Sequence, residues 1–164
     1  MIGELVGCFE RTATFMREQV ADLSDEEMVL TPPGVPNHAA WTLGHVIHGC
    51  QAIAVELGAE PWLPGDWESA FAYGSLPSQE ESERSCRSTL LAGLVEAADR
   101  LRIALLAVSE SDLAKPLPGE SAGEILPTLG DALLQVVAAH PAYHAGQLAA
   151  WRRAIGRAPV GTFV

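Results

Sequence analysis

The chain has 164 residues, of which 48% are hydrophobic and 19% are charged. This length and balance fit one compact globular domain and argue against an intrinsically disordered chain. A formal net charge of −11 repels phosphate backbones and anionic lipid, so we expect neither nucleic acid nor a membrane surface as a partner. The sequence has no apolar run of the ~20 residues that cross a bilayer, no basic signal-peptide start, and no disulfide framework among its three cysteines. We therefore expect a cytoplasmic protein.

The first predicted element is an amphipathic helix over residues 2–23. Its apolar and small residues recur in alternating steps of four and three, which places them on one helix face. This stripe consists of Ile2, Val6, Phe9, Ala13, Met16, Val20 and Leu23. Ser24 and Glu27 then form a capping-box pattern that predicts a short helical turn. Three prolines within residues 31–37 end that turn.

A second helix is predicted from His38 to Leu57, with Gly58 at its C-terminal cap. Because it is apolar on more than one face, it should be the most buried of the long helices. A connection of about twenty residues follows, over residues 58–77. Four aromatic residues lie in it, so we expect it to pack over one end of the helices; they are Trp62, Trp67, Phe71 and Tyr73.

Two further helices are predicted in the second half of the chain. A capping-box pattern at Ser78 and Glu81 begins the third, which we place at residues 79–109 on its heptad-like leucine spacing. The fourth begins near Pro127, a residue tolerated in a first helical turn, and ends at Gly156. Strand patterns are nearly absent. The sequence thus predicts an all-α fold, a single-domain four-helix bundle over residues 1–164.

Histidines interrupt the apolar faces of two of these helices. His140 and His144 are spaced i, i+4, so both imidazoles lie on one helix face about one turn apart. Buried imidazoles need partners for their nitrogens, and a metal ion satisfies both at once. In the second helix, His45 and His48 are each placed to supply a third ligand. Three imidazoles leave a coordination position open, as in catalytic metal sites.

These polar residues also have structural interpretations. A histidine on an apolar face is often a hydrogen-bonded core residue, and His48 fits that role or one that supports a ligand. His38 fits a cap at the start of its helix. Gln147 fits a polar contact inside the bundle or a supporting role at the metal, and Tyr143 fits either packing or the open side of the site.

Two motifs together resemble the DinB/YfiT-like superfamily of metal-binding four-helix bundle proteins. They are Trp41-x-x-Gly44-His45 in the second helix and His140-x-x-x-His144-x-Gly146-Gln147 in the fourth. The resemblance covers nearly the whole chain and implies a divalent ion, commonly zinc or nickel, held by one histidine of the second helix and two of the fourth.

Carried over to this sequence, those ligands are His45, His140 and His144, with His48 as the alternative to His45. Pro141 departs from a regular helix beside the first ligand of the last helix. It removes a backbone hydrogen bond and clashes with the carbonyl of Val137, so a kink there would either disturb or set the geometry of the pair.

The resemblance also implies function and assembly. Characterised members include enzymes that transfer or isomerise through low-molecular-weight thiols, so we expect thiol S-transfer to a small-molecule substrate, with a thiol cosubstrate. The alternatives are a metal-dependent hydrolase, with His48 as its base, and a non-catalytic metal-binding or interaction bundle. A homodimer is a further expectation from the resemblance.

Overall fold

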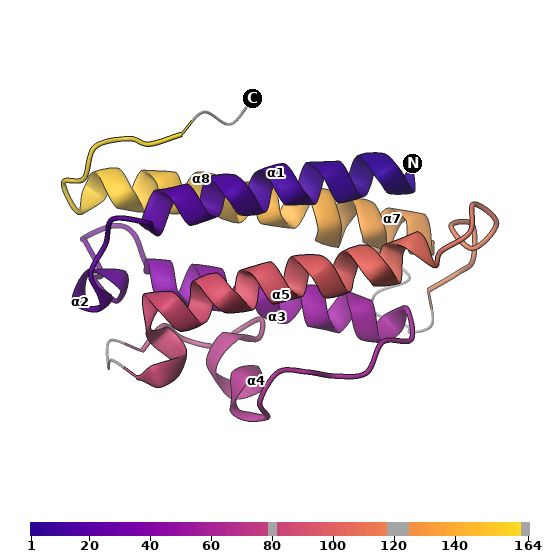
Figure 1. The fold of residues 1–164 in the computed structure, drawn as a ribbon, viewed down its shortest axis with the longest axis horizontal. Helices are drawn as coiled ribbons and strands as arrows, with labels where there is room; N and C mark the ends of the chain where they lie inside the picture. The colour runs from indigo at the N-terminus through magenta and orange to yellow at the C-terminus, as the bar shows by residue number, and fades with distance from the viewer. Residues whose placement is uncertain (79–81, 118–124, 162–164) are drawn as a thin grey trace.

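The long helices lie side by side along the long axis of the molecule (Figure 1). The computed structural model describes residues 1–78, 82–117 and 125–161. Its helices are α1 (Ile2–Val20), α2 (Asp25–Met28), α3 (Ala39–Glu56), α4 (Asp66–Phe71), the 3-10 turn η1 (Glu83–Ser85), α5 (Arg87–Leu106), α7 (Leu129–Leu133), the π-helical stretch η2 (Leu134–Ala139) and α8 (His140–Ala154). The predicted all-α bundle is confirmed.

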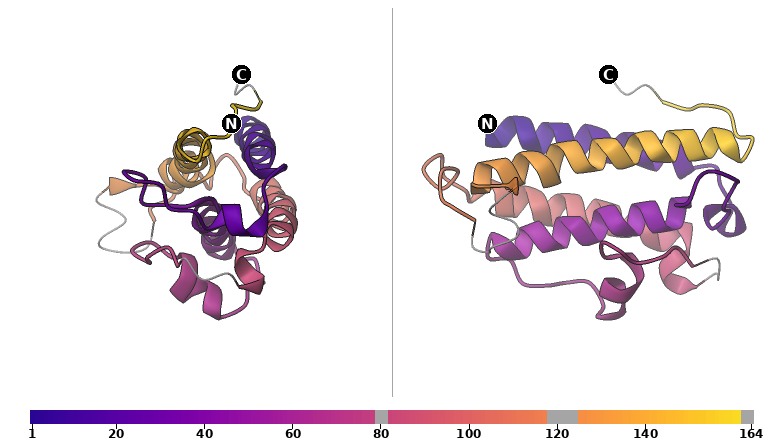
Figure 2. Two further views of the ribbon diagram at one scale, coloured as in Figure 1. Left: turned by 90° about the vertical axis from the view of Figure 1, so that its left-hand side faces the viewer. Right: turned by 180° about the vertical axis from the view of Figure 1, so that it is seen from behind.

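The bundle closes as a ring of four. α1 packs on α5 and on α8, and α3 also packs on α5 and on α8, as the end-on view in Figure 2 shows. α3 and α5 are neighbours that run in the same direction (Figure 1). Parallel neighbours need a long crossover, and residues 57–86 supply it.

The core is a continuous apolar cluster between these helices. The predicted stripe of α1 faces it, although Ile2 and Val6 are only partly buried. The largest apolar side chains that are fully buried are Met16, Met28, Leu43, Ile47, Leu90, Leu94, Leu101, Leu105, Leu133, Leu148 and Trp151. As predicted, α3 is buried on several faces, because it contacts two long helices as well as α4.

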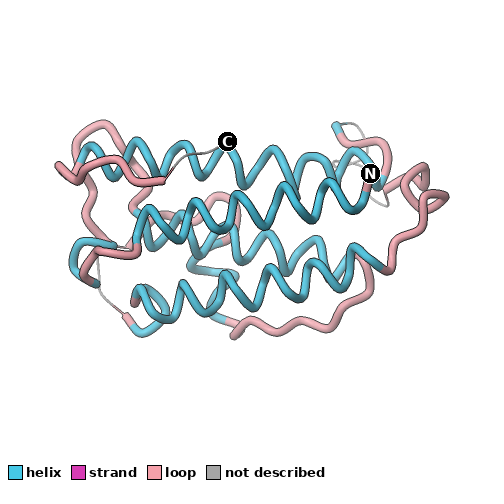
Figure 3. Tube along the Cα trace, turned by 45° about the horizontal axis from the view of Figure 1, so that its top comes forward, coloured by secondary structure: helices cyan, strands magenta, loops and turns pink. Residues whose placement is uncertain are grey.

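The long connection packs along the side of α3 rather than over an end of the bundle, which corrects our expectation (Figures 1 and 2). In Figure 3, loops lie at the two ends of the helices and along one side of the bundle. Trp67 and Phe71 of α4 are buried against α3. Gln51 of α3 holds the preceding stretch, because its side-chain oxygen accepts hydrogen bonds from the backbone amides of Trp62 and Leu63, at 2.7 and 2.6 Å. The connection is thus a folded unit attached to α3.

Several predicted helix ends shift. The α-helix α5 begins at Arg87, because Ser82 and Ser85 bond to each other in the turn η1 and Cys86 leaves helical geometry. Glu81 of the predicted box at Ser78 and Glu81 lies outside the described residues. The box at Ser24 and Glu27 is confirmed in both of its bonds. No described helix is both long enough and apolar enough to span a membrane.

The fourth helical segment is continuous but not uniform. It begins at Leu129, where the Thr128 side chain caps the amide of Asp131. It then widens to π-helix over Leu134–Ala139, with the amide of His140 donating to the carbonyl of Gln135, five residues back. Pro141 follows at once, at the start of α8. Pro141 has no N–H and cannot donate the hydrogen bond that a regular α-helix makes there. The change from α-helical to π-helical hydrogen bonding occurs just before it, so the helix accommodates Pro141 by local widening.

Candidate metal centre

Three histidines meet inside the bundle between α3 and α8. The Nε2 atom of His140 lies 3.0 Å from Nε2 of His45 and 3.1 Å from Nε2 of His144. His45 and His144 are buried, and His140 is partly buried. The same nitrogen of each ring therefore points toward one common centre.

The opposite ring nitrogens of two of these residues are fixed by acceptors. Nδ1–H of His45 donates to the carbonyl oxygen of Phe71 at 2.7 Å, and Nδ1–H of His144 donates to Oε1 of Gln147 at 2.8 Å. Since a neutral imidazole carries one N–H, Nε2 of both rings presents a lone pair. This arrangement of an outer acceptor orienting an imidazole is typical of metal-ligating histidines.

The protonation equilibria of the cluster favour neutral rings. Burial, together with the smaller effect of the neighbouring imidazoles, lowers the pKa of both His140 and His144 to about 4, and for His144 the hydrogen bond to Gln147 opposes this shift. Burial also lowers the pKa of His45, against the opposing effect of its bond to Phe71. All three rings are therefore neutral at pH 7, the state that binds metal.

A divalent ion fits this donor set. Hydrogen bonds alone cannot satisfy the three Nε2 atoms. Nε2 of His140 carries at most one proton, and that proton cannot point at the lone pairs of both neighbouring rings at once. With metal–nitrogen bonds of about 2.0–2.1 Å, tetrahedral zinc would hold its ligand nitrogens roughly 3.3 Å apart, close to the observed 3.0 and 3.1 Å. In the described part of the chain, the ligand nitrogens of these three histidines lie within 4.8 Å of one another, close enough to share one metal ion.

Trp41 and Gly44 complete the local structure around His45. The indole of Trp41 stacks on the His45 ring at a centroid distance of 4.7 Å, and its Nε1–H donates to Ser75 at 2.9 Å. A Cβ atom on Gly44 would lie 2.4 Å from the Phe71 ring. The glycine therefore lets α4 approach α3 closely enough for the Phe71 carbonyl to reach His45.

The other histidines lie apart from this centre. His48 Nε2 contacts Glu68 Oε2 at 2.7 Å on the solvent side of α3, and it is outside the three-histidine group. His38 caps α3, accepting from the amide of Trp41 at Nδ1, as the capping interpretation predicted. Its Nε2–H donates to the carbonyl of Ser78 at 2.9 Å.

An open cavity of about 800 Å³ lies over the three histidines. It is bounded on one side by the connection after α4 and on another by η2 and α8. Tyr143 and Gln147, which we predicted near the site, both line it. The residues lining it are Pro36, Asn37, Trp41, His45, Tyr73, Gly74, Ser75, Leu76, Pro77, Gln135, Ala139, His140, Tyr143, His144 and Gln147. The three histidines therefore border a cavity large enough for a small molecule.

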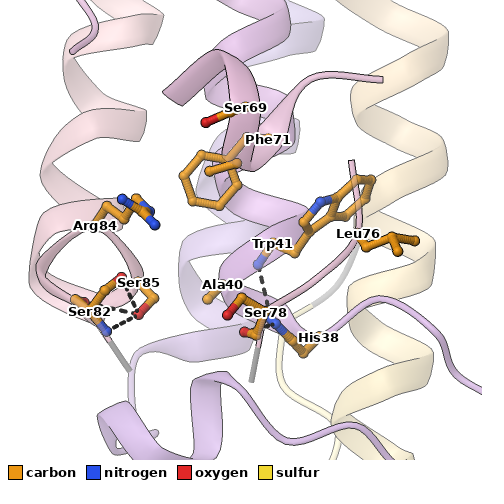
Figure 4. A pocket seen from close by; sticks show the side chains of 11 residues that line it. His38, Ala40, Trp41, Ser69, Phe71, Leu76, Ser78, Ser82, Arg84 and Ser85 are labelled. Atoms are coloured by element: carbon orange, nitrogen blue, oxygen red, sulfur yellow. Dashed lines mark hydrogen bonds between the residues drawn. The ribbon is translucent and has the colours of Figure 1, made fainter. Parts of the chain in front are cut away.

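A second pocket, of about 230 Å³, lies beside the beginning of α3 (Figure 4). Trp41 and Leu76 border both pockets. The polar residues that line the second pocket are mainly serines, and its arginine, Arg84, is paired with Asp66 at 2.5 Å. Figure 4 shows the bond from the Trp41 amide to His38 at this pocket. Its polar groups thus hold the start of α3 and η1.

Two parts of this site were not predicted from the sequence. The carbonyl of Phe71 carries no signature in the side chains, and the helix that presents it lies in a segment predicted only as a loop. The glycine of the Trp41-x-x-Gly44-His45 motif was the available signal, because a glycine inside a helix often marks a close approach of another element.

The fold and the site define a class of protein: a helical bundle whose interior carries three convergent imidazoles beneath an open cavity. The chain belongs to the DinB superfamily, whose family model matches residues 9–148. A crystal structure of a conserved protein from Enterococcus faecalis has the same fold, with a TM-score of 0.74 at 17% sequence identity over 96% of this chain and 98% of that one. Among curated proteins, no match to the sequence is found.

Proposed function

We propose that this protein is a divalent-metal-dependent enzyme that transfers the sulfur of a small thiol to an electrophilic substrate. His45, His140 and His144 would hold the ion, with zinc or nickel as the candidate metals. The observation that carries the proposal is the convergence of three neutral Nε2 atoms at the floor of an open cavity. A purely structural zinc site would instead be closed by a fourth protein ligand.

The chemistry that a bound divalent ion supplies is a lowered pKa for a coordinated thiol, so that a thiolate is available at neutral pH. In the transfer, sulfur forms a bond to the electrophilic carbon, the leaving group departs with its bonding pair, and the thiol proton passes to solvent. The protein's own contribution is to fix the imidazoles. The Phe71 carbonyl and Gln147 hold two of the rings, and Trp41 stacks on His45.

The hydrolytic alternative receives less support from the geometry. Its candidate base was His48, which faces Glu68 and is not among the described residues that line the cavity. A water-activating site needs a base within reach of the attacking water. Thiol transfer needs only the thiolate and an acceptor, so it fits the observed site better.

Metal analysis and thiol consumption test the proposal. Untagged protein should contain about one divalent ion per chain by mass spectrometry, and it should accelerate the reaction of small thiols with monochlorobimane. His144→Ala should abolish both, whereas His48→Ala, a change of the same residue type outside the cluster, should leave both intact. Equal thiol consumption by the native protein and His144→Ala would overturn the proposal. Esterase turnover that disappears with His48→Ala would instead support the hydrolase.

A further inference from the structure

The cavity above the three histidines has an unusual composition for this protein. The chain carries 21 acidic and 10 basic residues, yet none of the described residues that line the cavity is Asp, Glu, Lys or Arg. Away from the histidines, its polar side chains include the uncharged amides of Asn37, Gln135 and Gln147. Since burying an unpaired charge is costly, such a wall selects against ions and offers hydrogen bonds to neutral groups.

The rim of the cavity is aromatic and apolar. The sequence contains two tyrosines, and both line this cavity, Tyr73 from the connection after α4 and Tyr143 from α8. Tyr73 is 96% exposed and Tyr143 is 64% exposed, and the neighbouring Leu76 is 86% exposed. Large apolar side chains that gather around one cavity mark a binding surface, unlike single exposed ones scattered over a protein.

Aromatic rings also lead from this rim to the metal ligands. The Tyr143 ring packs edge-on against His144 at a centroid distance of 5.3 Å, and Trp41 stacks on His45 deeper in the cavity. Aromatic faces and edges recognise planar groups through stacked and edge-to-face contacts. A cavity of about 800 Å³ has room for such a group together with the part of the ligand that reaches the histidines.

We propose that the cavity binds an uncharged small molecule with a planar aromatic group, and that Tyr73 and Tyr143 determine this specificity. The aromatic group lies against the two tyrosines, while the sulfur or another donor atom of the ligand reaches the three-histidine centre. This inference rests on the proposed function for the metal-binding end of the ligand. What it adds is that the part of the ligand away from the metal-binding end is uncharged and aromatic.

Thiol binding to the cobalt(II)-loaded protein tests the inference without turnover, because the sulfur–cobalt absorption band reports occupancy. Four probes separate ring and charge: benzyl mercaptan is neutral and aromatic, 2-mercaptoethanol is neutral without a ring, 2-mercaptoethanesulfonate is anionic and cysteamine is cationic. At one pH, with each affinity corrected for the pKa of the free thiol, benzyl mercaptan should bind at least about tenfold more tightly than the other three.

Substitutions at the rim of the cavity then test whether the two tyrosines cause the preference for benzyl mercaptan. Tyr73→Ala and Tyr143→Ala should each weaken benzyl mercaptan about two- to tenfold and leave 2-mercaptoethanol unchanged. Tyr143→Phe should retain the aromatic preference. Ile103→Ala on α5, which removes a side chain that is also 64% exposed but lies outside the cavity lining, should change neither affinity.

The outcomes distinguish this inference from the function beneath it. If all four thiols bind with equal affinity and the tyrosine variants change nothing, the inference is overturned while the metal–thiol function stands. If no thiol produces the band, both are overturned. If sedimentation shows a dimer that Tyr73→Ala dissociates, with thiol affinities unaltered, the rim is an interface between copies of the chain and the inference is also overturned.

Discussion

Replacing Gly44 with alanine should weaken the metal binding that we propose, although Gly44 is not one of the three histidines. The new Cβ would lie 2.4 Å from Cδ1 and Cε1 of the Phe71 ring, where ordinary carbon contacts are about 3.5–4.0 Å. The ring must therefore retreat by about 1 Å. A retreat carried to the backbone would lengthen the 2.7 Å bond from His45 to the Phe71 carbonyl to about 3.7 Å, beyond hydrogen-bonding distance.

Two magnitudes follow for Gly44→Ala. Overpacking of this kind costs about 1–3 kcal/mol in the free energy of unfolding. Loss of the acceptor that orients a ligating imidazole weakens metal binding about 10- to 100-fold. Zinc affinity is measured by competition with a chromophoric chelator, and stability by urea unfolding of the metal-free protein.

A matched control is Gly146→Ala, because Gly146 lies two residues after His144 on α8 and a Cβ atom added there would meet no neighbouring side chain or element within 4 Å. That variant should keep its zinc affinity and gain about 0.5–1 kcal/mol of helix stability. In a Phe71→Ala background, which keeps the carbonyl but removes the ring, Gly44→Ala should cost little. If Gly44→Ala binds zinc as tightly as the native protein, the coupling through Phe71 is refuted.

Three further predictions concern other parts of the structure. Gln147→Ala removes the acceptor of the His144 Nδ1–H, so zinc affinity measured by chelator competition should fall about 10- to 100-fold, and an unchanged affinity would contradict that role. Pro141→Ala should leave the fold intact but allow regular helix to replace η2, and a crystal structure that still shows the π-helical stretch would contradict proline as its cause. The bond to Arg152 lowers the pKa of Asp22 to about 2, so this carboxylate contributes stability above its unfolded pKa and loses it as the pH falls from about 4 to 2. Asp22→Asn should show a shallower loss of stability by urea unfolding across that pH range, and an equal slope would exclude the pair as the cause.

The helices and the terminal histidine pair were predictable because both depend on spacing along one element. Apolar residues at steps of three and four define a helix face, and the same geometry puts His140 and His144 one turn apart. The choice between His45 and His48 was not determined by spacing alone, since the two positions lie only about 60° apart around α3 and a small rotation of the helix changes which ring faces α8. In the structure, His45 faces α8 and His48 faces Glu68.

What could not be predicted depends on contacts between segments distant in sequence. The Phe71 carbonyl is a backbone group of a six-residue helix in a connection, and such short helices have weak patterns. Likewise, Pro141 predicted a disturbance but not its form. Proline requires some local change in the helix, and whether that change is a kink or the widening of η2 depends on how the segment packs against α1 and α3, which sequence periodicity does not encode.

These parts together explain how an apolar bundle tolerates three imidazoles. Burial that lowers the pKa of His140 and His144 to about 4 makes their protonated forms costly, so the metal-free protein should lose stability as the pH falls from the unfolded value of about 6.5 toward 4. The same shift means that protons compete with a metal ion for these two nitrogens only near that lower limit. A site built this way gives up ligand basicity and gains preorganised, unprotonated lone pairs throughout the neutral pH range. Urea unfolding of the metal-free protein at pH 7 and pH 5 checks the argument, and equal stability at the two values would contradict it.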